Sequence, residues 1–168
     1  SVYELFTQAG KELIPVHSDK TIETTRLLLE RQGPQGPEYF FVRENDVLKL
    51  PGGDVYFEDA IPDWDIGNYI GSLQTNILND IRLETPWVTY VGDYEEEGHL
   101  CRVYAYPMNN NGFPVAYHEG RWINADNIRK ESFRYGYEAS VIKDWKQPEL
   151  IRGKGLSQAK SRIDQFAY

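Results

Sequence analysis

The 168-residue sequence has a single cysteine, Cys101. One cysteine cannot form an intrachain disulfide, and it cannot build a cysteine-based zinc site. This scarcity is typical of an intracellular protein in the cytoplasm or an equivalent reducing compartment. Long apolar runs are also absent, since stretches such as residues 39–42 are far shorter than the roughly 18 residues that a membrane-spanning helix needs. We therefore expect no membrane partner.

Basic residues are scarce: 18 Lys and Arg stand against 26 Asp and Glu, so the net charge is −8. Proteins that coat duplex DNA or RNA bind mainly by neutralising phosphates with Lys and Arg, and this charge argues against that class. A nucleotide or a short capped RNA remains a possible ligand. The apolar content of 40% and the chain length are sufficient for one domain with a substantial core.

Turn-forming residues divide the first part of the sequence into short strands, which we predict at residues 22–30, 39–43 and 47–50. After Pro86 we predict further strands at residues 87–91, 99–106, 113–117 and 121–123. Between the two groups, apolar residues recur at steps of three and four over residues 66–82, which predicts an amphipathic helix. Residues 132–145 and 157–166 have helical patterns as well.

This order of elements indicates an α+β fold or a three-layer α/β/α sandwich with a mixed sheet. Regular alternation of strands and helices is missing, so a Rossmann-type sheet is disfavoured. We predict three parts of the chain: an N-terminal lead-in over residues 1–20, a core over 21–130, and a C-terminal helical extension over 131–168 that packs on the same domain.

One motif in the sequence indicates a specific chemical function. Residues 48–55 read Leu-Lys-Leu-Pro-Gly-Gly-Asp-Val, and Glu58, Asp59 and the predicted helix follow. This order resembles the Nudix hydrolase superfamily, in which a strand ends in Leu-Pro-Gly-Gly and a helix with the pattern Arg-Glu-U-x-Glu-Glu-x-Gly-U, U being aliphatic, presents carboxylates to divalent cations. The resemblance covers about residues 20–130 and implies a Nudix-like α/β/α sandwich, a magnesium cofactor and a diphosphate substrate.

The helix departs from the family pattern in both possible alignments. Without a gap, the family's arginine and three glutamates fall on Gly67, Asn68, Gly71 and Ser72, none of which is an anionic ligand. An insertion of eight residues around residues 61–69 moves them to Thr75, Asn76, Asn79 and Asp80, and places the family's final glycine on Arg82. Either way the family's three helix glutamates are lost, so we expect magnesium binding to be weak or absent.

The resemblance implies a set of site residues in three roles. The metal ligands would be Glu58, Asp59 and Asp80, and the catalytic residues Asp80 and Glu119, the latter on a loop from which some Nudix enzymes supply a base. Ligand-binding residues would be Lys49, Gly52, Gly53, Asn76, Asn79, Arg82 and Arg102. The simpler interpretation of each cation is a paired surface charge, and Glu119 is equally well read as a solvated turn residue.

Three aromatic residues near the motif have two interpretations, and an acidic run has one. Phe57, Trp64 or Tyr69 would sandwich a nucleobase in a Nudix-like cleft, whereas core packing is the ordinary role of such side chains. The acidic run at residues 95–97 is most simply a solvated turn.

The sequence therefore predicts a degenerate Nudix-fold domain that binds a nucleotide or RNA end, or serves as an assembly subunit in a homodimer or with a protein partner. The alternative is an atypical magnesium-dependent pyrophosphohydrolase that acts on a nucleoside diphosphate linked to another moiety.

Overall fold

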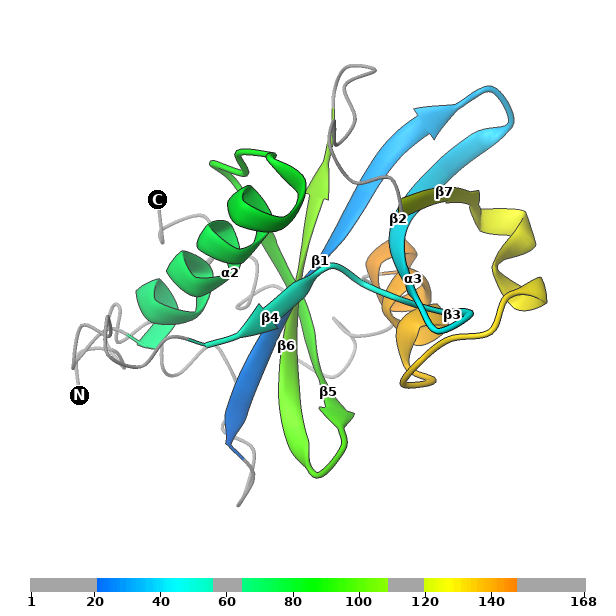
Figure 1. Cartoon of the computed structure of the whole chain (residues 1–168). Coiled ribbons are helices and arrows are strands. Elements are labelled where there is room, and N and C mark those ends of the chain that lie inside the picture. The colour runs from blue at the N-terminus through cyan, green and yellow to red at the C-terminus, as the bar shows by residue number, and fades with distance from the viewer. Residues whose placement is uncertain (1–20, 56–64, 109–119, 148–168) are drawn as a thin grey trace.

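The computed structural model describes residues 21–55, 65–108 and 120–147 (Figure 1). The strands in these ranges are β1 (Ile22–Gly33), β2 (Gly36–Glu44), β3 (Val47–Lys49), β4 (Gly52–Asp54), β5 (Thr89–Glu96), β6 (His99–Pro107) and β7 (Gly120–Asn124). The helices are α2 (Asp65–Ile81), α3 (Glu138–Lys146) and the short 3-10 helix η2 (Ala125–Lys130). The strand predicted at 113–117 and the helix predicted at 157–166 lie outside the described residues.

Strand β1 is the centre of a mixed sheet. It pairs in parallel with β6 and antiparallel with β2 and β4. Leu27, Leu28 and Leu29 are all fully buried, because a strand with a layer on each face places every side chain in a core. The run of leucines that reads as one apolar stretch in the sequence thus marks the middle of the sheet.

Strand β4 continues from β3 across a corner at Pro51 and joins β1 instead of β2. Gly52 lies opposite Arg26 with φ +149, and a Cβ there would collide with the backbone oxygen of Thr25. Only glycine fits this conformation and this close approach. The sequence predicted a strand end here but missed the second short strand, because β4 contains two glycines and one aspartate.

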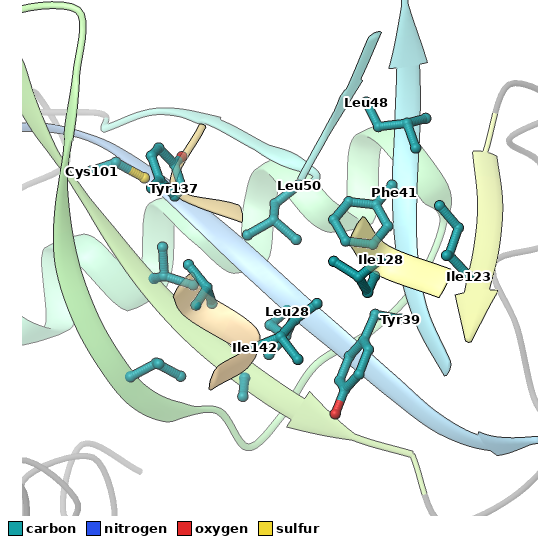
Figure 2. Packing of buried hydrophobic residues seen from close by; sticks show 14 residues of the cluster. Leu28, Tyr39, Phe41, Leu48, Leu50, Cys101, Ile123, Ile128, Tyr137 and Ile142 are labelled. Atoms are coloured by element: carbon teal, nitrogen blue, oxygen red, sulfur yellow. The ribbon is translucent and has the colours of Figure 1, made fainter. Parts of the chain in front are cut away.

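Helix α2 covers one face of the sheet, while η2 and α3 cover the other (Figure 1). Ile70, Leu73, Ile77 and Ile81 of α2 pack with Leu27 and Leu29 of β1 and their neighbours on that face. Leu28 points the opposite way, into a second cluster that includes Phe41, Ile128 and Ile142 (Figure 2). The predicted α/β/α sandwich with a mixed sheet and a C-terminal helical part is confirmed.

The helix predicted over residues 132–145 is wrong in its first part, because α3 begins only at Glu138. Before it, the chain runs along the edge of β3, where the Leu48 N–H donates to Ser132 and the Arg134 N–H donates to Leu48. Gly136 then turns the chain with φ +89. These edge hydrogen bonds outweigh the local helical preference of the segment.

None of the helices in the described ranges has the length and apolar character that crossing a bilayer requires.

Candidate functional site

The predicted site centres on the contact between β4 and α2. The Asn76 side chain is buried, and its Nδ2 donates a hydrogen bond of 3.0 Å to the backbone oxygen of Asp54. A Cβ on Gly53 would lie 3.2 Å from the same nitrogen, so the glycine allows this close packing. The Gly-Gly corner therefore lies against the helix, as the family resemblance implied.

Asn79 and Asp80 lie one turn beyond Asn76 and are both exposed. Residues three and four apart share one side of a helix, so these three polar side chains follow one line along α2. Over the described residues, no group of three or more His, Cys, Asp or Glu is placed to hold a metal ion. The other predicted acidic site residues, Glu58, Asp59 and Glu119, lie outside those ranges.

Arg82 ends helix α2 in the left-handed conformation, with φ 58. Its N–H donates to the Leu78 carbonyl at 3.0 Å, and its side chain is exposed. Glycine is the residue most often found in this conformation just after a helix. The alignment with the insertion, which places the family's final glycine on Arg82 and its three glutamates on Asn76, Asn79 and Asp80, stays a prediction.

Lys49 and Arg102, the other two predicted phosphate contacts, both have carboxylate partners. Lys49 on β3 forms an ion pair of 2.9 Å with Glu44, and its hydrogen bond holds the pKa of Glu44 below the usual value. Arg102 on β6 donates from Nε and Nη2 to the two carboxylate oxygens of Asp93, at 2.8 and 3.0 Å. Ligand binding by either cation stays a prediction.

The Arg102 guanidinium is buried beneath the first half of α2. Its central carbon lies 4.9 Å from the Tyr69 ring centre and 5.3 Å from that of Tyr90. Burial by itself lowers the pKa of Arg102, but the charge of Asp93 raises it well above the usual value. Tyr69, one of the three aromatic residues considered above as base contacts, thus covers the buried ion pair of Arg102 and Asp93. Phe57 and Trp64 lie outside the described residues.

Four half-buried apolar side chains pack against the core cluster under α2, and we call them together the apolar ledge: Leu83, Tyr106, Met108 and Trp122. Trp122 lies opposite Phe40 in the sheet, with their rings edge to face at 5.3 Å. Arg31 lies over the other side of the Trp122 ring, 4.1 Å from its centre. The sequence gives a weak indication of these positions, because Tyr106 near the end of β6 and Met108 just after it are two residues apart, the spacing at which extended backbone places side chains on one face.

A buried polar network lies on the opposite face of the sheet. Arg26 donates from Nε and Nη2 to Glu96 at 3.0 and 2.8 Å, and from Nη1 to the backbone oxygen of Leu50 at 2.9 Å. The Tyr137 hydroxyl donates to the same carboxylate at 2.7 Å. The interpretation of residues 95–97 as a solvated turn is therefore wrong for Glu96, which is 2% exposed, because the strand alternation turns it inward to Arg26.

These contacts govern the protonation of their members. Burial alone raises the pKa of Glu96, but the Arg26 hydrogen bonds outweigh it and hold that pKa below the usual value. Cys101 lies beside Tyr137 at one end of the cluster (Figure 2), and burial raises the pKa of its thiol to about 12. The thiol stays protonated at neutral pH.

Comparison with known proteins identifies the fold. No family model and no curated protein matches the sequence. Ap4A hydrolase of C. elegans is 12% identical, with a TM-score of 0.57, over 75% of this chain and 96% of that chain. The NUDIX domain of Shewanella oneidensis NrtR, solved with ADP ribose, is 10% identical, with a TM-score of 0.60, over 78% and 90%.

The C-terminal domain of mouse MUTYH, solved in complex with human PCNA, is 11% identical to this chain, with a TM-score of 0.59. The match covers 75% of this chain and 88% of that one. At such identities the likeness concerns the fold and leaves the activity open. The resemblance inferred from Leu-Pro-Gly-Gly and the order of elements is confirmed: this chain has the Nudix fold.

Proposed function

We propose that this chain is a degenerate Nudix domain that binds a diphosphate-containing nucleotide and hydrolyses it little. The observation that carries the proposal is the position of Asn76. In the alignment with the insertion it replaces the first of the three helix glutamates, and its side chain fastens α2 to β4 through Asp54. A buried amide that already bonds the backbone has no charge to offer a cation.

The remaining line of polar residues on α2 supports the same conclusion. Asn79 and Asp80 are exposed, and together they provide one carboxylate where the family concentrates three. Magnesium prefers anionic oxygen ligands in an octahedral shell, so one carboxylate and an amide hold it weakly. Fewer negative charges also repel a diphosphate less, which allows it to approach without a cation.

The apolar ledge and Arg82 suggest how such a ligand lies. Leu83 of the ledge follows Arg82 directly, so a phosphate near the exposed guanidinium would lie beside the ledge, where Tyr106 offers a half-buried aromatic ring. Stacking of a base on an aromatic side chain contributes about 1–3 kcal/mol. The Shewanella domain with the same fold was solved with ADP ribose, a ligand that combines a diphosphate with a base.

The main alternative is a magnesium-dependent pyrophosphohydrolase. Asp80 favours it, because this exposed carboxylate occupies the position of a family ligand, and Glu58 and Asp59 would complete the set with Glu119 as base. An RNA end would use the same phosphate and base contacts. The mouse MUTYH domain was solved bound to PCNA, which makes an assembly role a further alternative.

The binding proposal is tested by thermal unfolding with ADP-ribose in the presence of EDTA. A ligand at about a hundred times its Kd stabilises a protein by about 2.7 kcal/mol, so we expect a clear rise in Tm without metal. Arg82→Gln should reduce the rise. Arg129→Gln, which removes an exposed cation from the opposite face of the sheet, should leave it unchanged.

The hydrolysis part is tested by phosphate release from a nucleotide panel with Mg²⁺ or Mn²⁺. We expect slow release that Asp80→Ala does not change. Rapid metal-dependent release that Asp80→Ala abolishes would establish the pyrophosphohydrolase instead. If neither nucleotides nor short capped RNA shift the Tm, the binding proposal is wrong and an assembly role is favoured.

A further inference from the structure

η2 and α3 lie on the face of the sheet opposite α2 (Figure 1). Residues of these two helices line a pocket of about 480 Å³. Four apolar side chains are among its lining, the buried Ile128 and Ile142 and the smaller Ala125 and Ala139. Three exposed cations surround it: Arg129, Lys143 and Lys146. The volume is within the range of roughly 300–1,000 Å³ that is usual for ligand sites.

The two walls of the pocket have the same local pattern. η2 contributes an alanine, an isoleucine three residues later and then a cation, at Ala125, Ile128 and Arg129. α3 repeats this order at residues 139, 142 and 143 and adds Lys146 one turn further. Residues at such spacings share one side of a helix. The alanine side chains are too short to fill the space between the helices, and the two isoleucines are buried beneath it.

The acidic residues around this pocket are largely engaged elsewhere. Asp144 of α3 accepts a hydrogen bond of 2.6 Å from the Tyr94 hydroxyl, and Glu138 is fully buried. Glu131 faces Arg121, and Asp126 is the exposed acid of η2. The rim therefore has a local excess of positive charge, although the net charge of the whole chain is −8.

The sequence shows the same asymmetry on a larger scale. Residues 1–120 contain 20 acidic and 8 basic residues, whereas residues 121–168 contain 6 acidic and 10 basic residues. The pocket thus lies in the basic part of an acidic chain. The positive charge around the pocket itself, at Arg129, Lys143 and Lys146, attracts an anionic partner.

The lining chemistry distinguishes between anionic partners. None of the nine residues that line the pocket in the described part of the chain is aromatic, so this part of the lining offers no ring on which a nucleobase would stack. The aliphatic part of the lining instead accommodates an aliphatic side chain, and separate cations around it match carboxylates. We infer that this pocket is a docking site for an acidic segment of a partner protein that inserts a leucine-like side chain.

This site is independent of the proposed nucleotide site, because the sheet separates it from α2 and the apolar ledge. The test uses a fluorescein-labelled peptide of repeated Leu-Glu-Glu triplets and measures fluorescence anisotropy with the full chain. We expect saturable binding that Lys143→Glu weakens about fivefold, since a reversed exposed charge both removes an attraction and adds a repulsion. Ala139→Leu, which fills the pocket without changing charge, should weaken binding similarly.

Lys130→Glu is the matched control, because Lys130 is an exposed cation of η2 that does not line the pocket. It should leave peptide binding almost unchanged, and circular dichroism should show that all three variants fold. Equal losses in Lys130→Glu and Lys143→Glu would reveal only general charge attraction and overturn the inference. Equal binding of a Ser-Glu-Glu peptide, or tighter binding of oligouridylate that Lys143→Glu abolishes, would overturn it as well.

Discussion

The two faces of the central sheet each bury an ion pair, but they differ in the polar residues around it. On the α2 face, the polar line of the helix has one buried member, Asn76, while Asn79 and Asp80 remain in solvent. On the α3 face, an arginine and a glutamate are both almost fully buried and bond each other. The α2 face thus combines a buried pair, Arg102 with Asp93, with a polar line that reaches solvent, whereas the charged pair on the α3 face holds the structure together from within the core.

Stacked tyrosines complete the α3 face. The Tyr135 and Tyr137 rings lie 5.7 Å apart and nearly parallel, and Tyr94 stacks on Tyr137 at 5.3 Å. Arg26 lies 5.1 Å from the Tyr135 ring centre and donates to the carbonyl of Leu50. Because Leu50 directly precedes the Pro-Gly-Gly corner, this network positions the chain for the site on the other face.

The largest expected effect is the loss of the buried ion pair. Glu96→Gln leaves the Arg26 guanidinium buried without a countercharge, and breaking such a pair typically costs about 3–5 kcal/mol. Glu97→Gln changes the neighbouring residue, whose pair with Arg134 is exposed to solvent, so its loss should cost far less. Urea unfolding of both variants measures the contrast. If both variants lose a similar amount of unfolding free energy, the buried pair contributes no more stability than the exposed pair, and the assignment is wrong.

Acid pH provides a second readout of the same pair. The pKa of Glu96 is held below its usual value of 4.5 in the folded state. The stability it contributes is therefore present above that value and is lost as the pH falls through the folded pKa. The difference in unfolding free energy between the native protein and Glu96→Gln should shrink below about pH 4.5. A constant difference down to pH 3 would contradict this assignment.

The α2 face provides a smaller contrast between two asparagines. Asn76→Ala removes the hydrogen bond to the Asp54 carbonyl and should cost about 1–2 kcal/mol. Asn79→Ala changes an exposed side chain on the same helix and should stay within about 0.5 kcal/mol. Thermal unfolding without ligand measures both. If Asn79→Ala destabilises as much as Asn76→Ala, the burial of Asn76 is not what fastens α2 to β4.

Much of the fold could be predicted from periodicity, because long regular elements leave a clear pattern. The helix predicted over 66–82 is observed at Asp65–Ile81, and the strand predicted at 99–106 is observed at His99–Pro107. Short elements are harder to predict. β4 is a strand only because Gly52 and Gly53 meet β1, and no local preference of these residues indicates that contact.

The candidate site was predictable in part. The spacing of the motif placed the Gly-Gly corner against α2 and located the line of Asn76, Asn79 and Asp80. It could not show that Arg102 pairs with Asp93, or that Glu96 meets Arg26, seventy residues away in the chain. Such pairs depend on which strands become neighbours and on the face to which each residue points.

The smallest expected effect concerns the end of α2, where the site has an arginine in the place of the family's glycine. Arg82 adopts φ 58, a conformation that costs a residue with a side chain about 1 kcal/mol and costs glycine almost nothing. Arg82→Gly should therefore raise the unfolding free energy by about 0.5–1 kcal/mol. Arg82→Ala removes the same charge but keeps a Cβ, so it should give no such gain.

Denaturant unfolding of the two Arg82 variants distinguishes backbone strain from charge. Equal stabilisation by glycine and alanine would mean that the guanidinium, and not the backbone, is the unfavourable element at this helix end. The expected outcome also bears on ligand binding. If Arg82→Gly stabilises the fold while it weakens the effect of ADP-ribose on Tm, this position keeps a strained arginine that contributes to binding. The site would then give up stability at the same helix on which we propose that Asn76 and Asn79 replace acidic ligands.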